Sequence, residues 1–314
     1  MVVKRTILAC ILSIMSVLFS SLIHLEQVNS KSYNSLMERD WAEFYSPIII
    51  QNYEDTKDNF TNFDFDGDWN PLNNWQNMEY VILEPAIYYA ILETRTHVFV
   101  YFFLFYPRNN HTVAFIQNLH ENDLEGLCVT VEKETNEIVL IECQFHGILK
   151  SYLVDDDLSS ICDENRVNIT LFEDNGFHPV IKSESGGHGL YSDDNDISNE
   201  SIIFHNSSSE PNEYLNFTGE QVSYSLIVLY TTIWNQREII NPISAATSTF
   251  RYLSSPYLSV EIPGDDYGPL TANFPWSWKF GSDCLDTRGE WFFNPAIAFS
   301  KRWKGMENFS FVYT

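Results

Sequence analysis

The sequence has few basic residues for its size. Its 18 lysines and arginines are outnumbered by 43 aspartates and glutamates, which gives a formal net charge of −25 at pH 7. Nucleic-acid binding needs clustered Lys and Arg to neutralise phosphates, and electrostatic adsorption to anionic lipid needs the same charge. The composition therefore argues against both partners, whereas it permits the binding of a cation.

Recognisable enzyme motifs are also missing. The chain has no Gly-x-Ser-x-Gly, no His-Glu-x-x-His, no Walker loop and no dinucleotide-binding glycine fingerprint. Cys162 lies in an acidic loop, which raises rather than lowers the pKa of a thiol, so it is a poor nucleophile. These absences exclude a dinucleotide cofactor and leave open whether the protein is an enzyme at all.

Residues 1–30 read as a targeting segment. Lys4 and Arg5 precede an apolar stretch that runs from Thr6 to Leu25, and Val28 and Ser30 fit the −3 and −1 positions of a signal-peptidase site. The alternative is an uncleaved anchor, because about 20 apolar residues can span a bilayer. In either case the remaining chain is predicted to be secreted or extracytoplasmic, with or without a membrane anchor.

Four cysteines follow the targeting segment: Cys128, Cys143, Cys162 and Cys284. An even number in an exported chain suggests up to two disulfides. Alternation along the predicted hairpin places Cys128 and Cys143 on opposite faces, so their pairing is disfavoured and the connectivity stays open.

Asn-x-Ser/Thr sequons are also present and fit an exposed surface of a glycoprotein, with Asn at 59, 110, 168, 199, 206, 216 and 308.

Strand patterns dominate residues 31–314, which we interpret as one all-β domain. Residues 35–44 carry helix-compatible spacing, and short apolar, β-branched and aromatic runs follow, separated by polar turns. Residues 127–131 and 138–145 form the clearest hairpin. The tail from Pro263 to Pro295 is dense in Trp, Gly and Pro and is expected to be an irregular wrap. The fold class predicted is a β-sandwich with a short N-terminal helix and long loops.

The sharpest candidate site is the segment His120–Gly126, which we place in a loop before a strand. Asp123 and Glu125 are two residues apart, so on an extended backbone they point to the same side, and His120 can fold over them. Carboxylates favour calcium or magnesium, and a histidine adds zinc as an alternative. The pattern predicts a divalent-cation site, although the same groups could act as general acid and base or lie solvated at a strand end.

Further residues could belong to the same cavity. His146 and His188 lie at strand ends, and Glu93 and His97 lie on a neighbouring strand. In a separate run, oxygen ligands alternate as they do in a calcium loop; the run comprises Asp64, Asp66, Asp68 and Asn70. It lacks the glycine and glutamate positions of an EF-hand, and Asx turns explain the alternation as well.

Several short motifs, in order, resemble two known families. The chain carries His120-x-x-Asp123-x-Glu125, followed by Gln144–Gly147, Pro179–Ile181 and Gly187–Tyr191, and Tyr45–Ile48 precedes them all. This order is similar to that of the necrosis- and ethylene-inducing-like proteins and of the vacuolar-protein-sorting sixty-two-like family. The resemblance implies a lectin-like β-sandwich with a cation at an acidic cavity, which in the first group serves recognition of membrane glycolipid.

By position, the resemblance makes His120, Asp123 and Glu125 the metal ligands. It also implies that His120, His146 and His188 converge on this cavity. Leu124 and Asn122 depart from the family motif, and Asn109 stands where a further metal-site Asp is expected. Three hypotheses follow: a cation-dependent module that binds a glycan or a membrane lipid headgroup, a metal-dependent hydrolase that uses the same groups, and a structural cell-surface protein with a stabilising cation.

Overall fold

The structure is a computed structural model of the chain. It describes residues 38–52, 58–113, 116–145, 148–153, 159–160, 171–173, 176–192, 201–206, 220–236, 249–252, 259–260, 288–304 and 309–314. The chain divides into two compact units, Met1–Trp41 and Ala42–Thr314. The expected targeting segment lies outside the described residues. None of the helices within the described residues has the length and apolar character needed to cross a membrane.

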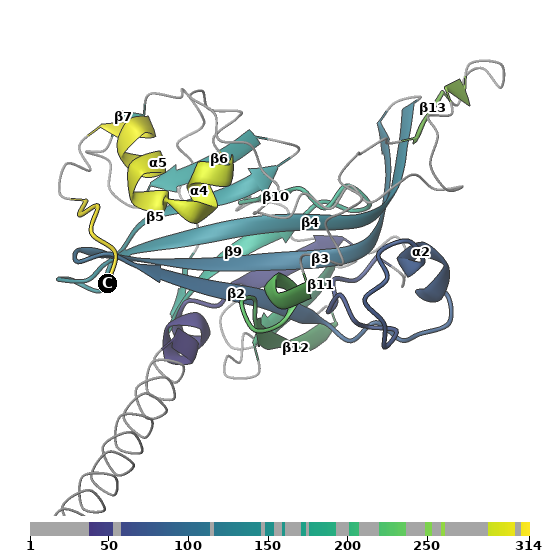
Figure 1. Ribbon diagram of the computed structural model, residues 1–314, viewed down its shortest axis with the longest axis horizontal. Helices are drawn as coiled ribbons and strands as arrows, with labels where there is room; N and C mark the ends of the chain where they lie inside the picture. Colours follow the sequence, from purple (N-terminus) through teal and green to yellow (C-terminus); the bar gives the residue numbers. More distant parts are fainter. Residues whose placement is uncertain are drawn as a thin grey trace, which may run out of the picture. The chain divides into compact units, whose positions relative to one another are not determined.

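The second unit is built mainly from strands (Figure 1). In chain order its elements are β1 (Ile48–Asn52), α2 (Asn74–Asn77), β2 (Ala86–Glu93), β3 (His97–Val113), β4 (Ile116–Glu132), β5 (Ile138–Phe145), β6 (Ile148–Leu153), β7 (Ser159–Ser160), β8 (Leu171–Glu173), β9 (Phe177–Ser183), β10 (Leu190–Tyr191), β11 (Ser201–Asn206), β12 (Gln221–Val228), η2 (Ile233–Gln236), β13 (Thr249–Tyr252), β14 (Ser259–Val260), α4 (Arg288–Phe293), α5 (Pro295–Arg302) and β15 (Trp303–Lys304). The all-β prediction is confirmed.

Strand β12 joins two parts of one large sheet. Its first half, Gln221–Tyr224, pairs in parallel with β11, and its second half, Ser225–Val228, pairs in parallel with β2. On one side of β12 the strand order is β10-β9-β1-β11, and on the other side it is β2-β3-β4, from which β5 and β6 continue. A strand that changes partner along its length lets a sheet turn over itself, so residues from distant parts of the chain can share one interior.

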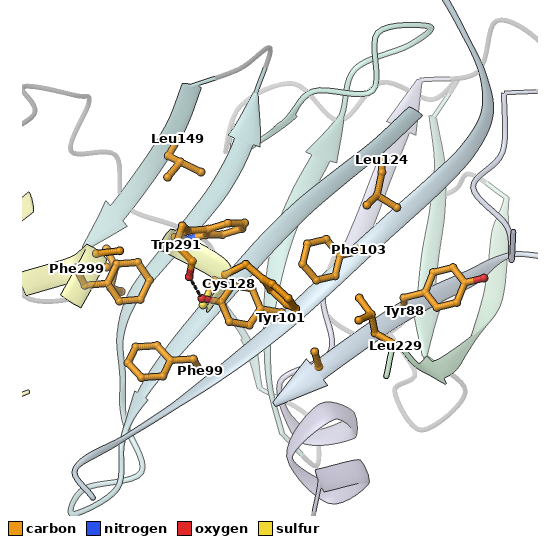
Figure 2. Close-up of a cluster of buried hydrophobic side chains, with 14 of the residues drawn as sticks. Tyr88, Phe99, Tyr101, Phe103, Leu124, Cys128, Leu149, Leu229, Trp291 and Phe299 are labelled. Carbon is orange, nitrogen blue, oxygen red and sulfur yellow. Dashed lines mark hydrogen bonds between the residues drawn. The ribbon is translucent and has the colours of Figure 1, made fainter. Parts of the chain in front are cut away.

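The long β3–β4 hairpin provides two buried faces. Side chains alternate along a strand, so β3 directs Phe99, Tyr101 and Phe103 to one face and Tyr106 to the other. The first face packs against α4 and α5, where Trp291, Phe292 and Phe299 are buried (Figure 2). The Tyr101 hydroxyl donates a hydrogen bond to the Trp291 carbonyl oxygen. The segment Pro263–Pro295, which we expected to be an irregular wrap, therefore ends in helix α4.

Three expectations about local structure are settled by this hairpin and its surroundings. The hairpin of β4 and β5 is confirmed, with Leu127 opposite Cys143 and Cys128 opposite Glu142, and both cysteines are buried free thiols on opposite faces. The loop expected at His120 is wrong, because β4 runs unbroken from Ile116 and pairs with β3 along its length.

Candidate functional site

The site begins on β4, where Asp123 and Glu125 are only 5% and 6% exposed. Their partners across the hairpin are Tyr106 and Leu104. Asp123 and Glu125 therefore share one face of the hairpin, as their spacing predicted. This face is the one opposite α4 and α5. Burial raises the pKa of the Tyr106 hydroxyl and the hydrogen bond with Ser183 lowers it, whereas the charges of Asp58, Asp123 and Glu125 raise it further.

His188 lies between two of these carboxylates. Its Nδ1 is 2.8 Å from Asp123 Oδ2, and its Nε2 is 2.8 Å from Asp58 Oδ1. The imidazole is fully buried and stacks on the ring of Tyr106, with centroids 3.6 Å apart and planes 6° apart. Segments that are 65 and 130 residues from His188 in sequence thus meet at this ring.

A tight turn between β9 and β10 holds His188 in place. The His188 N–H donates to the Glu184 carbonyl, and the Glu184 N–H donates to the Gly189 carbonyl. His188 has a φ of 58°, in the left-handed region that non-glycine residues rarely adopt. At Gly189 a Cβ would come within 2.7 Å of the Phe145 ring, so only glycine permits this approach. The local backbone is therefore shaped to place one imidazole.

The carboxylates change the protonation of His188. Burial alone lowers the pKa of an imidazole, but here the charge of Asp58 and the hydrogen bonds to Asp123 and Asp58 outweigh it and raise the pKa of His188 to about 9. For Asp58, burial raises the pKa, whereas the His188 charge, the hydrogen bonds from His188 and from the Gly186 N–H, and the Arg108 charge lower it, with a net decrease. At neutral pH His188 and Asp58 therefore form a buried salt bridge.

The same hairpin also positions the polar groups that neighbour these acids. The Asn109 Nδ2 donates to Asp123 Oδ2 at 3.1 Å. Glu121 is fully buried and accepts a hydrogen bond from the Trp75 N–H at 2.8 Å, which fixes α2 beside the site. Arg108 contacts Glu79 at 3.6 Å and lies over the Trp75 ring. The acids therefore lie within a network of fixed donors.

These contacts do not fit the ligand set that the family resemblance implies. Asp123 Oδ2 already accepts two hydrogen bonds, both nitrogens of His188 face carboxylates, and Asn109 presents an amide N–H to the site. Within the described part of the chain, no group of three or more His, Cys, Asp or Glu side chains is arranged to hold a metal ion. The divalent cation stays a prediction.

The other predicted site residues lie in several places. His188 is brought to Asp123, as the convergence hypothesis required. His120 lies in β4 and its backbone pairs with Asn109 of β3, but its side chain and the whole of His146 lie outside what the structure describes. His97 begins β3, nine residues before Tyr106 and about 30 Å along an extended strand. It stacks on Phe309, and Glu93 forms an ion pair with Lys133, so neither is brought to the site.

The suggested calcium loop is closed by its own hydrogen bonds. Asp66 Oδ1 accepts from the Asp68 N–H, Asp68 Oδ1 from the Asn70 N–H, and Asn70 Oδ1 from the Leu72 N–H. Burial and the charges of Asp66 and Asp68 raise the pKa of Asp64. These Asx turns account for the alternating pattern, and a calcium ion at this loop stays a prediction.

Sequence reasoning did not find Asp58 or the role of Arg108. Asp58 stands alone in a polar stretch, and no spacing rule connects it with a histidine 130 positions later. Arg108 could have been found, because it is two residues after Tyr106 and opposite Glu121, so strand alternation carries it toward the acids.

Comparisons with known proteins give only weak similarities. No protein-family model and no curated protein sequence matches the chain. A solved structure described as a toxin fold for microbial attack and plant defence is 14% identical, with a TM-score of 0.35, over 48% of this chain and 66% of its own. Necrosis and Ethylene inducing Protein 2, from the causal agent of cocoa's Witches Broom disease, is 13% identical, with a TM-score of 0.36, over 64% of this chain and 79% of its own.

A third structure, NLPPya in complex with glucosamine, is 12% identical, with a TM-score of 0.37, over 64% of this chain and 77% of its own. The neighbours thus include necrosis- and ethylene-inducing proteins. None of these three structures is described as a member of the vacuolar-protein-sorting sixty-two-like family. At these identities and TM-scores, the likeness carries no argument about the site.

Proposed function

We propose that this chain is a binding protein that recognises a glycan through the acidic cluster of Asp58, Asp123 and Glu125. The observation that supports this is the charge of the cluster: all three carboxylates act on the Tyr106 hydroxyl, and the described cations beside them are His188, which bonds Asp58 and Asp123, and Arg108, which acts on Asp58. Over these five described groups, three negative charges stand against two positive ones, a net charge of −1. Such a site is complementary to ligands rich in donors, which are the hydroxyl and ammonium groups of sugars and amino sugars.

The geometry also favours binding over chemistry. Asp123 is held by Asn109 and His188, and the ring of His188 is fixed by stacking and by the turn at Gly189. Rigid acceptors lose little entropy when a ligand binds, which raises affinity. A hydrolase would need a carboxylate or imidazole able to exchange a proton with a reacting group, whereas His188 donates to two carboxylates.

Titration calorimetry with amino sugars tests this proposal. Glucosamine and mannosamine are suitable probes, because complexes with both have been solved for NLPPya. We expect binding that weakens at least tenfold in Glu125→Gln and weakens with rising salt, because charge attraction contributes. Glu132→Gln is the matched control, since Glu132 lies on the same strand at the end far from the cluster. We expect it to bind like the wild type.

The competing hypotheses predict different results. If the chain is a hydrolase, incubation with oligosaccharides releases reducing ends, and Asp123→Asn abolishes the release. If the chain is a structural protein, neither the sugars nor the oligosaccharides bind, and Glu125→Gln changes only stability. Either result would contradict the proposed function.

A further inference from the structure

The two hydrogen bonds of His188 determine what kind of group the ring is. A neutral imidazole has one N–H donor and one acceptor nitrogen, whereas an imidazolium has two donors. Both nitrogens of His188 lie 2.8 Å from carboxylate oxygens, which accept but do not donate when ionised. The ring therefore donates on both sides and carries a positive charge between two negative ones.

We infer that the His188 imidazolium is a built-in counter-ion that takes the place of the divalent cation expected at this cavity. The inference goes beyond the proposed function and does not depend on it, because it concerns what neutralises Asp58 and Asp123, whether or not a glycan binds. It also gives a physical reason why Asn109 can stand where the resemblance implies a carboxylate: with the cation supplied by the chain, an amide donor to Asp123 is sufficient.

Three of the four carboxylate oxygens of Asp58 and Asp123 accept hydrogen bonds from described donors. Asp58 Oδ1 accepts from His188 and Asp58 Oδ2 accepts from the Gly186 N–H at 2.9 Å. Asp123 Oδ2 accepts from both His188 and Asn109. A divalent cation would have to displace these donors, and it would meet the positive charge of His188 at a few ångströms. Without His188, the ionised forms of Asp58, Asp123, Glu125 and Arg108 carry three negative charges and one positive, a net charge of −2; the His188 imidazolium brings it to −1.

The position of the ring is specifically constructed. His188 is completely buried, lies parallel to Tyr106, and is carried by a left-handed backbone between Gly187 and Gly189. A strained conformation of a non-glycine residue persists only where its surroundings fix it. A histidine that served only to fill space would need neither the two carboxylates nor this backbone.

The first test uses the wild-type protein. We expect purified protein to contain no stoichiometric calcium, magnesium or zinc by elemental analysis, and its melting temperature to be unchanged by EDTA or by any of the three ions. In a protein labelled with nitrogen-15 at histidine, we expect both ring nitrogens of His188 to show protonated chemical shifts at pH 7. A bound ion or a metal-dependent melting temperature that is lost in Asp123→Asn but kept in Asp66→Asn would overturn the inference, and so would a single protonated nitrogen.

The second test removes the counter-ion. In His188→Ala, Asp58 and Asp123 face a cavity of imidazole size with no positive charge between them. The variant should therefore bind a divalent cation, which the wild type does not. We expect calcium or magnesium to raise its melting temperature by several degrees, because an ion that binds only the folded state stabilises it. His205→Ala is the matched control, since His205 hydrogen-bonds only through Nδ1 to a backbone carbonyl in the described contacts, and it should gain no metal response.

A folded His188→Ala variant that ignores all three ions would also overturn the inference, because the ring would then not occupy a cation position. If this variant does not fold, the wild-type melting curves and the nitrogen shifts decide the question by themselves. Neither measurement involves sugar, so the inference and the proposed function can fail separately.

Discussion

The phenol ring of Tyr106 lies parallel to the imidazole of His188, with 3.6 Å between their centroids. Tyr106 is buried in the middle of β3, and its hydroxyl is 2.7 Å from Ser183 Oγ at the end of β9. One side chain thus connects the long hairpin with both the turn that carries His188 and the strand that precedes it. Stacking against an imidazolium adds a cation–π attraction to the area that the two rings bury.

We expect Tyr106→Ala to lower the free energy of unfolding by about 3–5 kcal/mol, because a large buried ring and its stack on His188 are both lost. Tyr106→Phe keeps the ring and loses only the hydrogen bond to Ser183, for which about 1 kcal/mol is expected. Urea denaturation followed by tryptophan fluorescence measures both. Equal losses in the two variants would show that the hydroxyl, rather than the stack, dominates.

A second buried charge pair fixes the C-terminal helices to the sheet. Glu142 of β5 is fully buried and accepts from Arg302 at 2.5 and 2.6 Å, and also from Ser151 and the Trp303 indole. Removing one partner leaves a buried charge without compensation. We therefore expect Glu142→Ala to cost about 3–5 kcal/mol in urea denaturation.

The ion pair between Glu93 and Lys133 is the control for that prediction. Lys133 Nζ and Glu93 Oε2 are 2.6 Å apart, but the two side chains are 27% and 33% exposed, so solvent screens the pair. Glu93→Gln should cost less than about 1 kcal/mol. A loss as large as that of Glu142→Ala would contradict the view that burial makes the difference.

His97 gives the fold a measurable pH dependence. Burial lowers the pKa of His97 to about 4, against the opposing charge of Glu132, whereas an unfolded histidine titrates near 6.5. Between these values the unfolded state binds more protons, so stability is present above pH 6.5 and is lost as the pH falls toward 4. The shift corresponds to at most about 3 kcal/mol.

Since carboxylates titrate in the same range, the measurement is the difference between wild type and His97→Phe. Phenylalanine keeps the stack on Phe309 and removes the titration. The difference in unfolding free energy between the two proteins should change steeply from pH 6.5 to 4. Parallel stability curves would refute the assignment.

Gly126 permits a close approach of β4 to the apolar face of β3. A Cβ at this position would lie 2.8 Å from Cδ1 and Cε1 of Phe103, which is fully buried next to Trp291 and Tyr101 (Figure 2). Gly126→Ala should therefore cost about 1–3 kcal/mol through overpacking. Calorimetry of this variant and of the double variant with Phe103→Leu checks the cause, because the smaller side chain should recover part of the loss.

Export is predicted from residues 1–30 alone. A fusion of residues 1–35 to a reporter that is active only outside the cytoplasm should give signal, because a basic n-region precedes a long apolar stretch. Replacing Lys4 and Arg5 by Glu is the control and should reduce the signal, since positive charge orients such segments. A silent wild-type fusion would refute the prediction.

The features that the sequence determined are those set by neighbouring residues. Alternation of apolar residues identified the β4–β5 hairpin and the opposite faces of Cys128 and Cys143, because the side-chain period of a strand is a local property. The same rule placed Asp123 and Glu125 on one side. Local pattern could not show where β4 begins, since its polar first half becomes a strand only by pairing with β3.

The composition of the site was decided by tertiary structure. Asp58 and His188 meet because β1 and β9, the strands that precede them, pair in parallel and end side by side, which no spacing in the chain records. The charge of His188 was decided in the same way. An isolated histidine titrates near neutrality, and only two buried carboxylates from distant segments make this one a cation. Sequence thus specified which groups line β4, and the fold determined what neutralises them.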